Sequence, residues 1–462
     1  MKKFDLTDNN LTLSRQLFHL SFPAMVSLSV QALYNIVDKL YIGNIPELST
    51  LGLAALTAIN PIMNIIIAIG TMFGVGGAVF YSILLGRKDT ESAEKIMGNT
   101  CFMLAVTNII FVTLLVTFFD RLAGLMGLDP SVMKMSKTYF FTIAPFSIFW
   151  AVGLGMNNFI RADGKALFAM VATVSGAVTN IILDALFVIV FRWGMFGVGL
   201  ATGIGQFVSF CFVMWFFQSK NCRYKLKFKG IRFNLKKTLK IAYYGIPSLV
   251  TTLCNILLNL YIIKTLLDPK VLGDFQPETA LAVQGIIFSL LSLLHIPIHA
   301  FCQGMQPLIG YNYGKKQYGN VMKVYRLALL YTTAFSAVIC VLLMISSEYV
   351  VMAFDGSRQL GVLGPNAVRL WNSMMPLVSF ELVSIGLFQA MGHGRKSVTL
   401  IVFRQLLALR VLIRLLSERW GIWGVFASMP IADLLTSLMI IVLLLVVIKD
   451  FSKRRENEEK CC

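Results

Sequence analysis

The chain has 462 residues, of which 57% are hydrophobic and only 14% are charged. A soluble protein of this length needs far more polar surface, so the composition indicates an integral membrane protein. Lysine and arginine outnumber aspartate and glutamate by 41 to 23. Because the basic residues lie mostly in short loops between apolar runs, this excess indicates loop charge that orients helices, and nucleic acid is not an expected partner.

About twelve apolar segments are long enough to cross a bilayer as α-helices. In chain order, they are predicted at 17–43, 51–85, 98–119, 137–160, 167–191, 195–218, 241–267, 280–313, 322–346, 368–391, 398–417 and 421–448. None of them alternates between apolar and polar residues as a strand of a membrane barrel does. The predicted fold is therefore an all-α integral membrane protein with twelve transmembrane helices.

The two halves of the chain repeat each other. Arg192-Trp193-Gly194 begins a heptad that returns from Arg419-Trp420-Gly421, and Phe22-Pro23 has a counterpart in Ile246-Pro247. Internal duplication of helices is a common way to build a transporter. The repeat predicts two pseudo-symmetric six-helix lobes. They are an N-lobe at 1–218 and a C-lobe at 241–448, with a basic cytoplasmic linker at 219–240 between them and a charged cytoplasmic tail at 449–462.

The distribution of basic residues predicts how the helices are oriented. If both termini lie in the cytoplasm, most of the loop lysines and arginines fall on the cytoplasmic side, as the positive-inside rule requires. The linker is the richest of these loops. It could also hold anionic headgroups, so membrane lipids are expected partners, although orientation of the helices is the favoured role.

Acids within the apolar segments are functional candidates, because a charge in a bilayer is costly. There are four of them: Asp38, Asp184, Glu381 and Asp433. From a rise of 1.5 Å per residue, Asp38, Asp184 and Thr202 all lie roughly 8–12 Å beneath the outer surface. Further polar residues share their helix faces: Gln31, Tyr34 and Asn35 with Asp38, Asn180 with Asp184, and Gln206 with Thr202.

These residues predict one polar pocket in the first half of the chain. Two carboxyl groups in it, Asp38 and Asp184, could hold a proton or, when both are ionised, a Na+ ion. The alternative is that each acid forms a structural pair with a neighbour. Lys39 is adjacent to Asp38 in sequence but points about 100° away from it on the helix.

The second half of the chain is less acidic. Asn255 and Asn259 lie one turn apart, and with Glu381 they form a candidate second cation or substrate site. One face of the eighth segment carries His295, His299, Gln303 and Gln306. No acid or cysteine joins these histidines at metal-ligand spacing, so a cavity-lining or helix-bridging role is favoured. For Glu381 the functional and structural roles both stay open, whereas Asp433 is expected to be structural.

Basic residues within the apolar segments are the hardest to place. Lys39, Arg404, Arg410 and Arg414 all fall in predicted spans. Arg414 can extend outward to the interface, whereas Arg410 is expected to face the protein interior or a wet cavity. Pro23 removes one backbone hydrogen bond from the first helix and is predicted to act as a hinge in it.

Several motifs resemble those of the multidrug and toxic compound extrusion (MATE) family of cation-coupled exporters. They are the segment from Gln31 to Asp38 with Gly43, the segment from Gln303 to Gly314, Asn180-Ile-Ile-Leu-Asp184, and Pro430-Ile-Ala-Asp433. The resemblance implies a V-shaped arrangement of two six-helix lobes around a central cavity, with export by alternating access. It also implies a cation site at Asp38, Asn180, Asp184 and Thr202. The chain departs from the family pattern where its seventh segment has no acid, although Glu381 can fill the role of the family's helix-10 acid.

The predicted function is an antiporter that exports lipophilic, often cationic, small molecules in exchange for H+ or Na+, without a cofactor. The chain is expected to be a monomer in a bacterial plasma membrane. One alternative is a flippase for lipid-linked precursors, which would need a strongly cationic central cavity. Another is a membrane-embedded enzyme built on His295 and His299. No nucleophile–base pair or metal triad stands at usable spacing, which argues against an enzyme.

Overall fold

Capping residues and prolines set where the helices of this chain begin and break. In the computed structural model, residues 11–43, 49–125, 129–220, 222–226, 233–353 and 358–461 are described. Asp129 caps one helix by accepting the backbone N–H of Ser131, and Pro130 takes its first position. Pro145 and Pro376 lie at breaks within the fourth and tenth helical segments, where each removes a backbone donor.

Helices account for all the regular structure in the described part of the chain. The N-lobe contains α1 (Leu13–Gly43), α2 (Ser49–Gly86), α3 (Thr90–Thr117), α4 (Phe119–Leu125), α5 (Pro130–Ile143), the 3-10 turn η1 (Ala144–Phe146), α6 (Ser147–Ala162), α7 (Ala166–Asp184), the π turn η2 (Ala185–Val190) and α8 (Gly194–Gln218). The C-lobe contains α9 (Leu235–Leu266), α10 (Pro269–Leu272), α11 (Pro277–Leu294), α12 (Ile296–Gly314), α13 (Tyr318–Met352), α14 (Arg358–Asn372), α15 (Met375–Ala390), α16 (Gly394–Val402), the π turn η4 (Phe403–Ala408), α17 (Leu409–Trp420) and α18 (Ile422–Cys461).

Most of the helical segments are long and apolar enough to cross a membrane, so this is a multi-pass membrane protein. Among the described residues ten helices meet this description, or eleven if Leu360–Asn372 and Met375–Ala390, which meet at 44°, form one span. The span predicted at 398–417 is not apolar enough to be counted among them, because that segment carries three arginines. It is nevertheless helical, as α16, η4 and α17 in succession, and completes six helical segments in the C-lobe.

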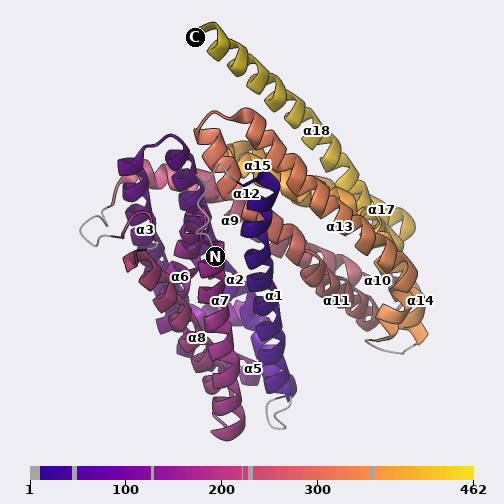
Figure 1. Cartoon of the computed structure of the whole chain (residues 1–462). Coiled ribbons are helices and arrows are strands. Elements are labelled where there is room, and N and C mark those ends of the chain that lie inside the picture. The colour runs from indigo at the N-terminus through magenta and orange to yellow at the C-terminus, as the bar shows by residue number, and fades with distance from the viewer. Residues whose placement is uncertain are drawn as a thin grey trace.

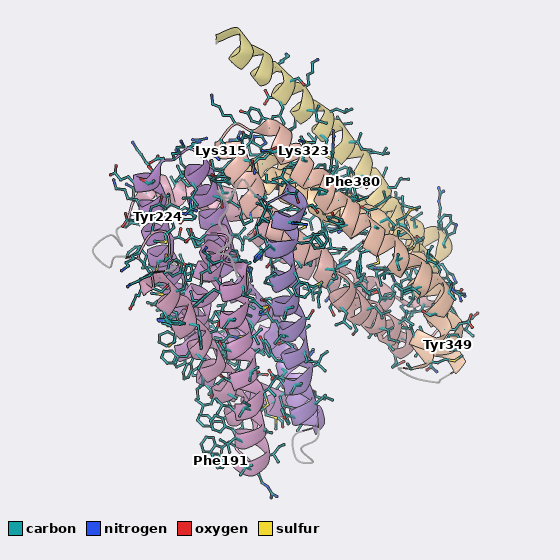
Figure 2. The ribbon with its side chains drawn as sticks, in the orientation of Figure 1. Phe191, Tyr224, Lys315, Lys323, Tyr349 and Phe380 are labelled. Carbon is teal, nitrogen blue, oxygen red and sulfur yellow. The ribbon has the colours of Figure 1, made fainter. Side chains whose placement is uncertain are left out.

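The two lobes form a V that is joined at one end and open at the other (Figure 1). Figure 2 shows Lys315 and Lys323 at the joined end, and Phe191 and Tyr349 at the far, separated ends of the N-lobe and C-lobe. Basic residues such as Lys315 and Lys323 thus lie at the joined end.

Backbone conformation confirms the internal repeat. Lys88 and Lys316 both adopt φ 61°, in the turns that follow α2 and α12. Gly194 and Gly421 adopt φ 57° and 56° within the two copies of the repeated heptad. A left-handed conformation is uncommon for lysine, so its recurrence at matched places indicates that the same turn was kept in both halves.

Glycines allow the lobes to touch at the joined end. A Cβ atom on Gly76 of α2 would lie 2.2 Å from the Ile241 carbonyl oxygen of α9. A Cβ atom on Gly304 of α12 would lie 2.2 Å from the Ser21 hydroxyl of α1. These two contacts occupy equivalent places in the repeat. Small residues let helix backbones approach closely in a membrane, so glycine packing closes the joined end.

The first helix of each lobe crosses to the other lobe at this end. Leu17 and Leu20 of α1 are fully buried in an apolar cluster with Leu308 and Val324 of the C-lobe. Ile241 of α9 is buried in a cluster of N-lobe side chains. The helix that carries Asp38 therefore belongs to both lobes, which places it where relative motion of the lobes can act on it.

The linker is shorter than the sequence predicted. Helix α9 begins at Leu235, where the Asn234 side chain accepts the Lys237 backbone N–H, so the predicted loop up to 240 is wrong at its end. Of the linker, residues 221 and 227–232 lie outside the described residues. The predicted tail at 449–462 begins as a continuation of α18, and Cys462 lies outside the described residues.

Asp163, in the turn between α6 and α7, holds the start of the linker against the N-lobe. The Tyr81 hydroxyl donates to one Asp163 carboxylate oxygen at 2.5 Å, and the backbone N–H of Arg223 donates to the other at 3.3 Å. Burial raises the pKa of Asp163, and these two hydrogen bonds oppose the rise. The connection between the lobes is thus anchored on the N-lobe side.

Candidate functional site

A central cavity of about 710 Å³ lies between the lobes. It follows α1 from Ser27 to Lys39, a length of about 18 Å at the rise of an α-helix. Predicted cavity residues that line it are Gln31, Tyr34, Asn35, Asp38, Thr202, His299, Gln303 and Gln306. The polar stripes predicted on the first and eighth spans therefore face one shared space.

Two predicted cavity residues do not line this cavity. Gln206 is half-buried one turn beyond Thr202, where Gly205 packs so closely on α7 that a Cβ atom would lie 2.7 Å from the Gly176 carbonyl oxygen. His295 lies at the break between α11 and α12, so the face that His299 shares with Gln303 does not continue through it. The sequence prediction placed His295 on the same face as His299 by assuming one continuous helix, whereas the helix is broken at His295.

Asp38 and Asp184 come together from α1 and the end of α7. Their carboxyl groups lie close enough to interact directly. Asp184 is 0% exposed and Asp38 is 8% exposed. Within the described part of the chain, Oδ1 of each carboxyl group has no hydrogen-bond donor. Two carboxyl groups in this position repel each other if both are ionised.

Polar neighbours fix this carboxyl pair in place. Asn180 Nδ2 donates to Asp184 Oδ2 at 3.1 Å and lies 3.5 Å from the Thr202 hydroxyl oxygen. The Thr202 hydroxyl donates to the Val198 carbonyl at 2.9 Å and lies near Tyr139, a buried cavity residue that the sequence reasoning missed. Asp184 is the last residue before the π turn η2, and π turns occur often at functional sites. All four residues of the predicted N-lobe site are adjacent in the structure.

The C-lobe acids are paired with an arginine that lies between them. Arg404 Nε lies 2.6 Å from Glu381 Oε2, and Arg404 Nη2 lies 2.8 Å from Asp433 Oδ1. Both acids are 1% exposed. Gln405, the next residue, donates to Asn255 at 2.9 Å. The single guanidinium group therefore lies between two carboxyl groups and can balance one of their two charges.

Asn259, the remaining residue of that candidate site, lies one turn from Asn255. Its side-chain oxygen is buried and has no hydrogen-bond partner among the residues described. Neither asparagine lines the central cavity. The polar C-lobe cluster is thus separate from the Asp38–Asp184 pair.

The prediction that Arg410 faces the interior was wrong. Arg410 is exposed, with its guanidinium carbon 5.5 Å from the centre of the Tyr261 ring. The π turn η4 (Phe403–Ala408) contains Arg404 and ends before Arg410, so it shifts the helix register between them, and Arg404 points inward instead. Arg414 is exposed near Glu418, at 3.6 Å, in agreement with its predicted outward course.

Arg161 is a cavity residue that the sequence reasoning did not find. It lies in the last turn of α6, and its Nη1 donates to Gln303 Oε1 of α12 at 2.6 Å. Because it directly follows the predicted span at 137–160, it was assigned to a loop. Its counterpart in the other half, Gln389 of α15, donates instead to Ser248 of α9 at 2.9 Å, within the C-lobe.

The histidines do not form a metal centre. No group of three or more His, Cys, Asp or Glu side chains that could hold a metal ion occurs within the described ranges. The rings of His295 and His299 lie 6.1 Å apart, edge to face. Only His299 reaches the central cavity.

Comparisons with known proteins agree with this architecture. The family model described as MatE matches residues 23–186 and 247–412, one match in each half. The chain is 24% identical over 435 residues to the multidrug export protein MepA of Staphylococcus aureus (strain NCTC 8325 / PS 47), covering 92% of both chains.

Solved structures show the same fold. One, an outward-facing conformation of a multidrug resistance MATE family transporter of the MOP superfamily, has a TM-score of 0.88 and 21% identity, covering 95% of this chain and 96% of that one. Another, a crystal structure of MATE in the straight conformation, has a TM-score of 0.90 and 20% identity, covering 98% and 100%. The predicted fold of two six-helix lobes is confirmed.

Proposed function

Because this chain belongs to the MatE family, we propose that it is a cation-coupled antiporter that exports lipophilic, often cationic, small molecules by alternating access. Its relative MepA is a multidrug export protein, and its architecture is that of a transporter and not of an enzyme. The open end of the V faces away from the basic turns. In this conformation the cavity can release a substrate outward and take up a coupling ion from outside.

The observation that carries this proposal is the carboxyl pair beside the cavity. Asp38 lines the cavity and touches Asp184, which is closed to solvent. An ion that enters the cavity can thus reach a buried acidic site through Asp38. A proton bridging the carboxyl groups removes their repulsion. A Na+ ion would be held by carboxylate oxygens together with the Thr202 hydroxyl, which are the oxygen ligands that hard cations take.

Coupling requires that the ion binds the two conformations of the transporter unequally. Asp38 is on α1, which packs on both lobes, and Asp184 is on α7 of the N-lobe. Occupation of the pair changes the attraction between α1 and α7. We propose that this shifts α1, with Pro23 as its hinge, and thereby favours substrate release.

The cavity suits drug-sized ligands. Its volume of about 710 Å³ lies within the range of small-molecule sites. Its apolar walls include Leu28, Ile59, Met63, Trp150 and Leu154. Flexible and aromatic side chains of this kind can repack around ligands of different shape, which supports a broad range of lipophilic substrates.

The proposed location is a bacterial plasma membrane with both termini in the cytoplasm. The start of α1 lies beside Asn320 and Lys323, near the basic turn after α12, which supports a cytoplasmic N-terminal side. One chain supplies both lobes of the cavity, which supports a monomer. Exposed apolar side chains over the helices, such as Ile345 and Leu445, are the expected contacts for membrane lipids.

The flippase alternative is less well supported. A strongly cationic cavity would be needed for lipid-linked phosphates, but Asp38 lies in the same cavity as Lys39 and Arg161. Mixed charge fits small organic ions better than a polyphosphate.

Everted membrane vesicles test the proposal. Vesicles with the wild-type chain should accumulate a fluorescent lipophilic cation when an ion gradient is imposed, and Asp38→Asn vesicles should not. Asp120→Asn is the matched control, because Asp120 is an exposed acid that pairs with Lys137 outside the cavity. Equal accumulation in wild-type and Asp38→Asn vesicles would refute the proposed coupling site.

A further inference from the structure

The floor of the central cavity holds an arginine with unused hydrogen-bonding capacity. A guanidinium group has five N–H donors, and Arg161 uses one of them on Gln303 Oε1 at 2.6 Å. No Asp or Glu among the described residues forms an ion pair with it. The amide oxygen of Gln303 is neutral, so the positive charge of Arg161 is not balanced by its partner.

Arg161 and the acids lie at different levels of the same cavity. Gln303 is next to Gly304, which packs against Ser21 near the cytoplasmic end of α1. Asp38 is near the other end of α1, about 25 Å further along the helix at 1.5 Å per residue. The cavity is therefore positive at its closed floor and negative toward its open end, apart from Lys39, which is exposed at the mouth.

We propose that Arg161 is a specificity-determining residue that binds the carboxylate of zwitterionic substrates. This inference rests on the proposed export function, because it assigns a substrate class to the same cavity. The carboxylate replaces Gln303 as a partner of Arg161 or bonds to its remaining donors. The cationic part of the substrate then lies along the apolar walls toward Asp38.

The physical basis is the shape and charge of the guanidinium group. Its planar donors match both oxygens of a carboxylate, and hydrogen bonds between charged groups are about twice as strong as neutral ones. At the floor, the surrounding walls keep water away from the contact and strengthen it. Asn157, Asn158 and Gln306 line the cavity near Arg161 and can complete the hydrogen bonds of a bound carboxylate.

The test uses two dyes that differ in one group: a rhodamine with a free carboxyl group and its methyl ester. Both carry the same cationic ring system, but only the first is zwitterionic. Binding to the purified full-length protein is measured by fluorescence anisotropy, with no ion gradient. Because this assay measures binding alone, it can be interpreted even if the protein does not export the dyes. If the protein shows no preference between the dyes, the export proposal still stands.

Wild-type protein should bind the free acid at least about fivefold more tightly than the ester. Arg161→Gln should weaken binding of the acid about tenfold, the loss of roughly one charge-assisted contact, and change binding of the ester by less than about twofold. Arg161→Lys keeps the charge and should retain most of the preference. Arg410→Gln, which removes an exposed arginine outside the cavity, is the control and should alter neither dye.

Three results would overturn the proposal. They are a wild-type protein without preference for the acid, an Arg161→Gln variant that binds both dyes equally weakly, and one that binds both as wild type does. The second result would make Arg161 a structural tie between the lobes. The wild-type comparison needs no variant, so a substitution that prevents folding does not remove the test.

Discussion

Gly86 of α2 and Gly314 of α12 pack against each other at the joined end of the lobes. A Cβ atom on Gly86 would lie 2.1 Å from the Tyr311 carbonyl oxygen, and one on Gly314 would lie 2.1 Å from the Ile83 carbonyl oxygen. The two glycines hold equivalent places in the internal repeat, so the contact lies on the pseudo-two-fold axis. Each lobe supplies the same surface to close the joined end.

Gly314→Ala should therefore disfavour the outward-open conformation. The added methyl group cannot fit without moving backbone, so the joined end must separate. Spin labels at Lys88 and Lys316 should show a longer distance in the variant, and export should fall at least severalfold. Gly319→Ala is the matched control, because nothing lies within 4 Å of a Cβ atom at Gly319. Indistinguishable label distances in the two variants would show that the close contact does not hold the end shut.

Asp38→Asn and Asp184→Asn should each abolish coupled export while leaving the protein in the membrane. Either change removes a carboxyl group of the proposed ion site, because an amide neither takes up a proton near neutral pH nor supplies a negative charge to a cation. The double variant should be no worse than either single one, since the two groups act as a unit. Drug resistance of cells at matched expression measures the effect. Wild-type resistance in either single variant would remove that residue from the site.

Arg404→Gln should be the most destabilising change in the C-lobe cluster. It leaves Glu381 and Asp433 buried without a cation, and breaking a buried ion pair costs about 3–5 kcal/mol. Glu381→Gln keeps the Arg404–Asp433 pair and should cost less stability. It should also reduce export less than Asp38→Asn does. Thermal unfolding of the purified variants gives the order of stability, with Arg410→Gln as the exposed control.

If Glu381→Gln abolished export as completely as Asp38→Asn, the coupling site would have to be placed in the C-lobe. If Glu381, Arg404 and Asp433 serve only to stabilise the fold, the export rate of each variant should instead be proportional to the amount of folded protein.

Pro23→Ala should reduce export while substrate binding stays measurable. Pro23 has no N–H to donate within α1, and its own carbonyl accepts the Ser27 hydroxyl at 2.9 Å, so the helix can bend there at low cost. Spin labels on α1 should show a distance change with pH or Na+ that is lost in Asp38→Asn. Pro247→Ala is the matched control, because α9 carries no acid in its membrane segment. Identical α1 distances across pH and Na+ in the wild type would contradict the hinge.

The sequence predicted the lobes and the N-lobe site because these depend on local patterns. Hydrophobic length defines a span, and polar residues one turn apart share a face wherever the helix is regular. Asp38, Asn180, Asp184 and Thr202 lie on unbroken stretches of helix, so their estimated depth was enough to group them. The repeated heptad likewise predicted two halves, which the matched turns at Lys88 and Lys316 confirm.

The errors occurred where helix geometry is irregular or where contacts are formed between lobes. The π turn η4 shifts the helix register so that Arg410, which was expected inside, is exposed, and no propensity signals such a turn. The break before α12 displaced His295 from the face of His299. Arg161 meets Gln303 only because two distant segments pack together, which a single sequence without helix-packing information cannot show.

Transport by purified protein in proteoliposomes tests the central claim most directly. A lipophilic cation is loaded, and an H+ gradient and a Na+ gradient are imposed in separate experiments, for the wild type and for Asp38→Asn and Asp184→Asn. We predict that at least one gradient drives substrate movement against its own concentration in the wild type, and that neither gradient does so in the two variants. Substrate movement that is equal with and without both gradients, or that persists in the variants, would contradict cation coupling at the Asp38–Asp184 pair.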